Sequence, residues 1–173
     1  MKDVCWTLFS TSLGWVGLLV TARGVRRLTL PQSSPDKALD ILLAGEGFIG
    51  EECEDKARDV IERLVAFYRG EAVDFSDVEL DMEGRPPFFR RVWQTVREIP
   101  RGETMTYGEV ALRVGKPGAA RAVGQAMAAN PYPPIVPCHR VLGHKGRLGG
   151  FRGGLDLKRH LLALEGIRVP TQS

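Results

Sequence analysis

Residues 106–129, TYGEVALRVGKPGAARAVGQAMAA, decide the fold of the second half of this chain. Thr106 can cap a helix over Tyr107–Val114, because Glu109 stands three residues further on, at the capping-box spacing. A Gly-Lys-Pro-Gly turn follows, and Ala119–Ala129 predicts a second helix. Two short helices joined by a glycine-containing turn are typical of a helix-turn-helix, although an ordinary helical hairpin has the same pattern.

Two details of this helix pair favour contact with nucleic acid. Lys116 and Arg121 stand at the start of the second helix, where the backbone dipole attracts phosphate groups. One face of that helix is made of small residues: Ala119, Ala120, Ala122, Gly124 and Ala126. Such a face permits close approach to a narrow groove, and it equally permits close packing in a core.

Upstream, the apolar spacing predicts another helix that ends at Pro100, with one face made of Phe88, Val92, Trp93, Val96 and Ile99. Downstream, a segment rich in proline (130–134) leads to Ile135–Val141, which reads IVPCHRV. Its Cys138 and His139 place a thiol beside an imidazole, the material for an activated thiolate nucleophile. The structural alternative is a buried cysteine next to a core histidine.

Charge divides the chain. Residues 1–84 hold nine Lys/Arg and sixteen Asp/Glu, a balance of −7, whereas residues 85–173 hold fifteen and five, a balance of +10. This asymmetry indicates two domains, 1–84 and 85–173, of which the basic one would meet a polyanion such as nucleic acid. A solvated basic face is the alternative interpretation.

The N-terminal half shows β-like alternation over residues 4–30, with breaks at Gly14, Gly17 and Gly24, which predicts a small antiparallel meander. Residues 51–69 carry apolar side chains at helical spacing and predict an amphipathic helix that stops at Gly70. An acidic stretch without a pattern follows, and residues 84–87 form a linker.

The three cysteines, Cys5, Cys53 and Cys138, form neither a secreted disulfide framework nor a metal-ligand spacing. A bond between Cys5 and Cys53 stays an open alternative, although nothing in the sequence demands it. The apolar run Leu13–Val20 is too short to span a bilayer, and Asp3 does not suit a signal peptide. We expect a cytoplasmic protein with no membrane contact.

Several spaced motifs occur in order over some sixty residues: Tyr107, Ala120–Gly124, Asn130-Pro131, Pro137–Val141, Gly149–Phe151 and Leu161–Gly166. With them the chain closely resembles the O6-alkylguanine-DNA alkyltransferase family, strongly over residues 88–169 and loosely before. The resemblance implies an α/β (α+β) fold, with a small ribonuclease-H-like sheet domain followed by a winged helix-turn-helix domain. It also implies a DNA-repair enzyme, a methylated-DNA–protein-cysteine methyltransferase, which moves the alkyl group from O6 of guanine irreversibly to its own Cys138. No cofactor is needed, and each molecule reacts once.

The resemblance assigns the catalytic roles. Cys138 is the nucleophile, His139 takes its proton through a bridging water, and Glu165 orients the imidazole. Tyr107 donates a proton to the departing purine, and Asn130 buttresses the thiol segment. The alternative for Asn130 is a simple Asn-Pro turn, and the two interpretations are compatible.

The substrate implied is double-stranded DNA, bound through the minor groove by a monomer that flips the damaged base into a pocket. Arg121 is the finger that replaces the flipped base, or else a phosphate contact. The other expected DNA contacts are Lys116, Thr106, Ala120 and His144. The expected pocket residues are Met127, Pro133, Val141, Phe151 and Arg152. Family members often have Tyr at the position of Phe151 and a small polar residue at that of Arg152, which puts pocket width in doubt.

Some relatives bind structural zinc in the N-terminal domain, but no histidine precedes His139 here, so we expect no metal. Three other functions are alternatives. A non-catalytic sensor of alkyl lesions would lack the nucleophile, and Cys138 argues against it. A winged-helix regulator would need base-reading side chains, which the small-residue helix lacks. A Cys-His hydrolase is the third.

Overall fold

The computed structural model describes residues 4–45, 50–52 and 55–169. The chain divides into two compact units of mixed α and β structure. One comprises Met1–Glu83 with Pro131–Pro133, and the other comprises Gly84–Asn130 with Pro134–Ser173. Within the described ranges, no helix is long and apolar enough to cross a membrane.

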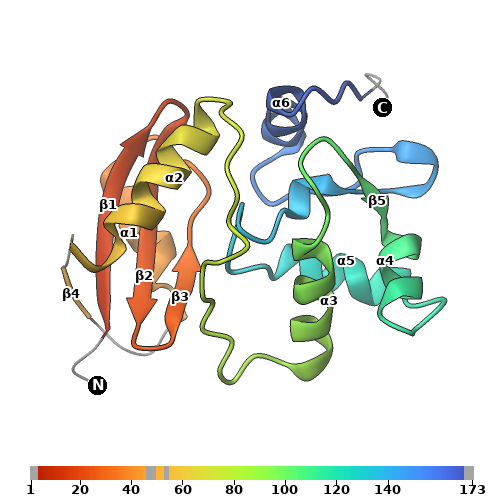
Figure 1. Cartoon of the computed structure of the whole chain (residues 1–173), viewed down its shortest axis with the longest axis horizontal. Helices are drawn as coiled ribbons and strands as arrows, with labels where there is room; N and C mark the ends of the chain where they lie inside the picture. Colours follow the sequence, from red (N-terminus) through yellow and green to blue (C-terminus); the bar gives the residue numbers. More distant parts are fainter. Residues whose placement is uncertain (1–3, 46–49, 53–54, 170–173) are drawn as a thin grey trace. The chain divides into compact units, whose positions relative to one another are not determined.

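The first unit contains the predicted meander: strands β1 (Cys5–Thr11), β2 (Gly14–Thr21) and β3 (Gly24–Leu28) pair in antiparallel fashion (Figure 1). A short strand, β4 (Glu51–Glu52), adds to β1 in parallel. Gly17 was expected to break a strand, but it lies inside β2 opposite Leu8. A Cβ on Gly17 would lie 3.1 Å from the side chain of Leu42, so the glycine allows a helix to pack closely on the strand.

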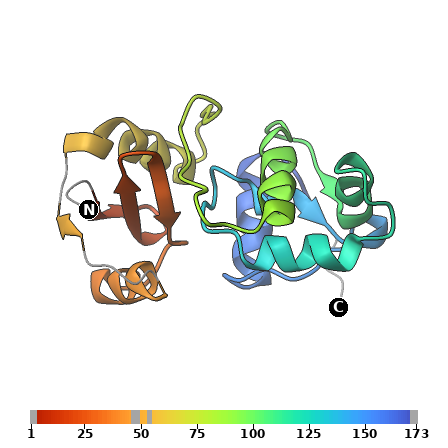
Figure 2. The same ribbon diagram turned by 90° about the horizontal axis from the view of Figure 1, so that it is seen from below.

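Two helices cover opposite faces of this sheet, α1 (Pro35–Leu43) and α2 (Arg58–Tyr68) (Figures 1 and 2). The helix predicted over residues 51–69 was wrong at its start, because β4 and a 3-10 turn, Asp55–Ala57, precede α2. Helix α1 was not predicted. The fully buried aliphatic core between these layers consists of Val16, Leu18, Leu19, Ala38, Leu42 and Leu64.

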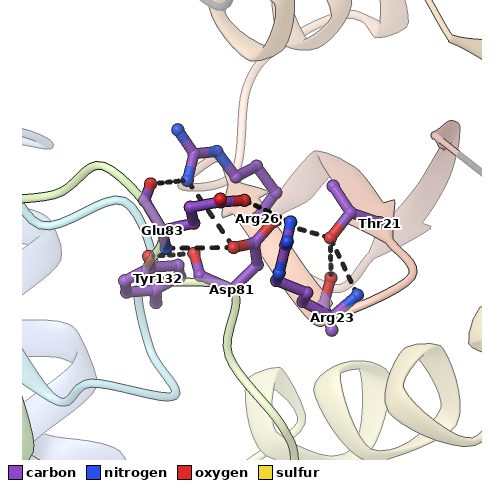
Figure 3. Close-up of polar contacts among 7 residues, drawn as sticks. Thr21, Arg23, Arg26, Asp81, Glu83 and Tyr132 are labelled. Atoms are coloured by element: carbon purple, nitrogen blue, oxygen red, sulfur yellow. Dashed lines mark hydrogen bonds and ion pairs between the residues drawn. The ribbon is translucent and has the colours of Figure 1, made fainter. Parts of the chain in front are cut away.

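Residues Pro131–Pro133 are anchored within the first unit, far in sequence from the rest of it. The Leu28 N–H donates to the Pro131 carbonyl at 2.8 Å, and the Tyr132 hydroxyl donates to the Asp81 carbonyl at 2.6 Å (Figure 3). The buried Asp81 carboxylate in turn accepts from the Thr21 hydroxyl at 2.6 Å and lies 3.8 Å from Arg26. Buried polar groups that are satisfied in this way fix one geometry, because leaving any of them unpaired is costly.

The described residues of the second unit form four helices and two short strands. They are α3 (Pro87–Arg97), β5 (Met105–Thr106), α4 (Tyr107–Arg113), α5 (Ala120–Ala128), β6 (Val141–Leu142) and α6 (Leu155–Leu164). Single 3-10 turns lie at Cys138–Arg140 and His144–Gly146. Trp93 lies in the core of this unit and joins α3 to α5, because its indole N–H donates to the Ala126 carbonyl at 2.8 Å.

The local predictions for this unit are confirmed. The helix expected to end before Pro100 is α3, and the pair of helices around the Gly-Lys-Pro-Gly turn is α4 and α5. The Thr106 hydroxyl accepts from the Glu109 N–H at 3.1 Å, and the Glu109 carboxylate accepts from the Thr106 N–H at 3.3 Å. This reciprocal capping fixes the start of α4 at Tyr107.

Candidate active site

Strand pairing brings Tyr107 close to the thiol segment. β5 and β6 run parallel, with Met105 opposite Val141 and Thr106 opposite Leu142. Helix α4 therefore starts beside the strand that directly follows the 3-10 turn containing Cys138. The capping box of α4 and the pairing of β5 together set the position of Tyr107.

Cys138 is a free thiol, buried to 9% exposure. Asn130 holds its segment, since its side-chain N–H donates to the Val136 carbonyl at 2.9 Å and it also hydrogen-bonds Cys138. Burial raises the pKa of the thiol, and this outweighs the opposing effects of the Asn130 hydrogen bond and of the Lys158 and Arg152 charges. Basic surroundings alone would lower the pKa of the thiol, but desolvation penalises the thiolate more. At rest the group is a thiol, and its activation needs a base.

His139 and Glu165 form a buried pair, with 2.5 Å between the His139 Nε2 and a Glu165 carboxylate oxygen. Burial alone would raise the pKa of Glu165, but hydrogen bonds with His139 and Arg140 bring it down to about 2. Burial lowers the pKa of His139 despite the adjacent carboxylate. The resting pair is thus a neutral imidazole bonded to a carboxylate, which suits a general base.

Tyr107 keeps its proton strongly. Burial, and then the charge of a Cys138 thiolate, raise the phenol pKa, while a hydrogen bond with the Gly150 backbone acts in the opposite direction. Gly149 permits this placement, because at φ +67° a Cβ on it would lie 2.9 Å from the phenolic oxygen. Such a phenol gives up its proton only to a group that becomes strongly basic.

Lys158 is a site residue that the sequence argument missed. It has no exposed surface, and its Nζ donates to the carbonyls of Val141 (2.8 Å), Leu148 and Gly150 (3.3 Å). Burial lowers the pKa of Lys158 to about 8, and the Cys138 thiolate opposes that decrease. Its position in the sequence carries a signal, since it stands three and four residues before the buried Leu161 and Leu162 on α6, on the apolar face.

The remaining predicted residues fall into three groups. Met127, Pro133 and Val141 are buried, and Pro133 belongs to the first unit. Phe151 is half-buried, and the exposed Arg152 donates to the Ala128 carbonyl. Of the expected DNA contacts, Lys116, Arg121 and His144 are exposed, whereas Thr106 and Ala120 are half-buried.

No group of three or more His, Cys, Asp or Glu side chains in the described part of the chain is arranged to hold a metal ion. Cys5 takes part in a disulfide, and Cys53 lies outside the described residues. The chemistry of the second unit thus centres on its buried thiol. A buried thiol whose neighbour in sequence is an imidazole paired with a carboxylate defines the class: a protein that uses cysteine as an activated nucleophile.

Comparison with known proteins identifies the family. Residues 87–167 match the family described as "6-O-methylguanine DNA methyltransferase, DNA binding domain". A methylated-DNA–protein-cysteine methyltransferase of Mycolicibacterium paratuberculosis is 54% identical over 105 residues, which cover 61% of this chain and 62% of that protein. One from Methanosarcina acetivorans is 50% identical over 66% of this chain and 72% of that protein.

Solved structures match nearly the whole chain. The crystal structure of Mycobacterium tuberculosis OGT in complex with DNA is 36% identical, with a TM-score of 0.77 over 97% of this chain and 96% of that chain. The O6-methylguanine-DNA methyltransferase of Pyrococcus kodakaraensis is 28% identical, with a TM-score of 0.70 over 95% and 99%. The chain belongs to the methylated-DNA–protein-cysteine methyltransferase family.

Proposed function

We propose that this protein repairs DNA by transferring the alkyl group of O6-alkylguanine to its own Cys138, once per molecule. The observation that carries the proposal is the buried, free Cys138 thiol next to the His139–Glu165 pair, in a chain of this family. The chain spans only 62% of the length of the M. paratuberculosis protein, whose name gives the same activity and so supports the proposal.

Each residue has a step in the reaction. His139 accepts the Cys138 proton, and the sulfur attacks the alkyl carbon as the bond from that carbon to O6 breaks. The bonding electrons move into the purine, and Tyr107 donates its phenolic proton to a ring nitrogen. The proton that the imidazole gains balances the one that the phenol loses. The products are guanine and an S-alkyl thioether, which has no leaving group to release, so the protein does not turn over.

We further propose that the chain binds double-stranded DNA through a winged helix-turn-helix in residues 85–173, and that residues 1–84 form a ribonuclease-H-like domain without catalytic residues. Helices α4 and α5, with exposed Lys116 and Arg121, support this, as does the DNA complex of the similar M. tuberculosis protein. In this proposal a monomer enters the minor groove, Arg121 fills the space of the flipped base, and Met127, Val141 and Phe151 line the base pocket.

Intact-mass analysis tests the function. The protein is incubated with a duplex containing one O6-methylguanine, and its mass should increase by one methyl group, which peptide mapping should place on Cys138. Cys138→Ser should gain no mass. A methyl group on another residue, or no gain by the parent protein, would refute the proposed reaction.

A further inference from the structure

Arg140 binds the same carboxylate as His139. Its Nε donates to one Glu165 oxygen at 2.8 Å, and its Nη2 lies 3.2 Å from the other, which is the oxygen that contacts His139. Its Nη1 donates to the Ile99 carbonyl at 2.6 Å, which fixes the plane of the guanidinium. The Gly102 N–H adds a further bond to Glu165 at 3.1 Å. The carboxylate is thus held from three directions.

The balance of charge around His139 depends on this arrangement. The side chains of Glu165 and Arg140 are 0% and 11% exposed, so their charges cancel at close range with little screening by water. Further charged or titratable groups near the imidazole include Lys158 on α6 and Cys138 in the same 3-10 turn. Arg101 lies at the C-terminal end of α6, next to Glu165, and donates to the Leu164 carbonyl. A proton on His139 would therefore join a neutral pair and a cationic lysine.

The same geometry selects the tautomer. An ionised carboxylate only accepts hydrogen bonds, so the Nε2 that faces Glu165 carries the hydrogen. The lone pair of the neutral imidazole is then on Nδ1. Without Arg140 the negative charge of the Glu165 carboxylate would be uncompensated and would stabilise the imidazolium form of His139. The imidazolium has no free lone pair and cannot accept a proton.

We propose that Arg140 is a positioning residue that neutralises Glu165 and thereby holds His139 as a neutral, correctly oriented base before the reaction. The consequence for catalysis rests on the proposed alkyl transfer, whereas the protonation state of His139 does not. The opposing effects of Glu165 and Arg140 on the pKa of His139 agree with this role.

The test is an NMR titration of the unreacted, full-length protein labelled with 13C at histidine Cε1. The chain has only three histidines, so the signal of His139 is assigned with His139→Gln. Arg140→Met should raise the pKa of His139 by about one unit or more, because a nearby opposite charge loses its compensation. Arg140→Lys keeps the charge and should restore a pKa close to that of the parent. Arg159→Met removes one positive charge from α6, the helix that carries Lys158, and should leave the pKa of His139 unchanged.

An unchanged pKa in Arg140→Met, or an equal rise in Arg159→Met, would overturn the proposal. If Arg140→Met does not fold, Arg140→Gln, which keeps donors but no charge, tests the same effect. A second measurement follows the rate of reaction with free O6-benzylguanine against pH. The acid limb should move to higher pH in Arg140→Met, whereas a purely structural loss would lower the rate equally at every pH. Since the titration needs no substrate, its result stands apart from the mass test of the proposed reaction.

Discussion

The ammonium of Lys158 lies 2.8 Å from the Val141 carbonyl oxygen, three residues along the chain from the reactive Cys138. Through its bonds to Leu148 and Gly150 the same group also holds the far end of the loop that follows β6. One buried cation thus fixes both ends of this loop and acts electrostatically on the thiol. Burying a charge is costly, so its presence without exposure to water indicates a functional demand.

We expect Lys158→Met to slow the reaction with free O6-benzylguanine about tenfold at pH 7, because the loss of one stabilising charge raises the thiol pKa by about one unit. The pKa of Lys158 is lowered to about 8, so the ammonium is present below that pH and is lost above it. The difference in reaction rate between the parent and Lys158→Met should therefore become smaller above pH 8. The exposed Lys145 offers the control Lys145→Met, which should follow the parent. A difference that stays constant with pH would contradict the electrostatic role.

Gly149→Ala should damage the position of Tyr107. A Cβ at Gly149 would lie 2.9 Å from the phenolic oxygen, whereas a Cβ at Gly146, which also has a positive φ (+77°), meets nothing within 4 Å. Both substitutions should cost about 1 kcal/mol of unfolding free energy from backbone strain. Only Gly149→Ala should also slow alkyl transfer, by about tenfold or more, because the general acid is displaced. Single-turnover rates and urea unfolding of both variants provide the comparison, and equal rates would disprove the steric argument.

Glu165→Gln should change how stability depends on pH. The pKa of Glu165 is lowered from 4.5 to about 2 in the folded protein, so its contribution to stability is complete above about 4.5 and is lost as the pH falls toward 2. The free energy of unfolding of the parent should therefore fall toward that of Glu165→Gln as the pH decreases across this window. Urea unfolding between pH 5 and pH 2 measures the difference. The exposed Glu103 supplies the control Glu103→Gln. If the difference in unfolding free energy between the parent and Glu165→Gln did not change with pH, the lowered pKa of Glu165 would be contradicted.

Arg121→Ala should slow repair of a duplex far more than reaction with a single strand or with free O6-benzylguanine. Extruding a paired base costs a few kcal/mol, and an inserted side chain offsets part of that cost. Lys116→Ala, which removes a charge from the turn before α5, should instead weaken binding to duplex and single strand alike and make the dependence on salt shallower. Equal loss of rate on all three substrates would remove Arg121 from base flipping.

Local features of this fold could be predicted from the sequence because they depend on neighbouring residues. The capping box of Thr106 and Glu109 and the apolar face of α3 are set within one or two helical turns. The start of α2 was misplaced because Glu51–Glu52 pairs with β1, a partner that no local pattern reveals. The same limit applies to Pro131–Pro133, whose attachment to the first unit is tertiary.

The candidate site was predictable in part. The resemblance supplied Cys138, His139 and Glu165, and the structure pairs the last two directly. It did not supply Lys158 or Arg140, because lysine and arginine are exposed by default and only a tertiary environment makes them buried. For the same reason the direction of the Cys138 pKa change could not be predicted, since burial cannot be read from a basic composition.

The attachment of Pro131–Pro133 to the first unit has a consequence for synthesis in the cell. The strands β1 to β3 and both helices of that unit are complete once Glu83 has left the ribosome, but the partners of the Leu28 amide and the Asp81 carbonyl have not yet been translated. At ordinary elongation rates they follow on the order of seconds later, after α3, α4 and α5. In the nascent N-terminal unit the Leu28 N–H and the Asp81 carbonyl therefore form these two hydrogen bonds only after Pro131–Pro133 has been made, a segment that ends five residues before Cys138. Co-translational maturation of the N-terminal unit thus finishes only as the reactive cysteine itself is being made.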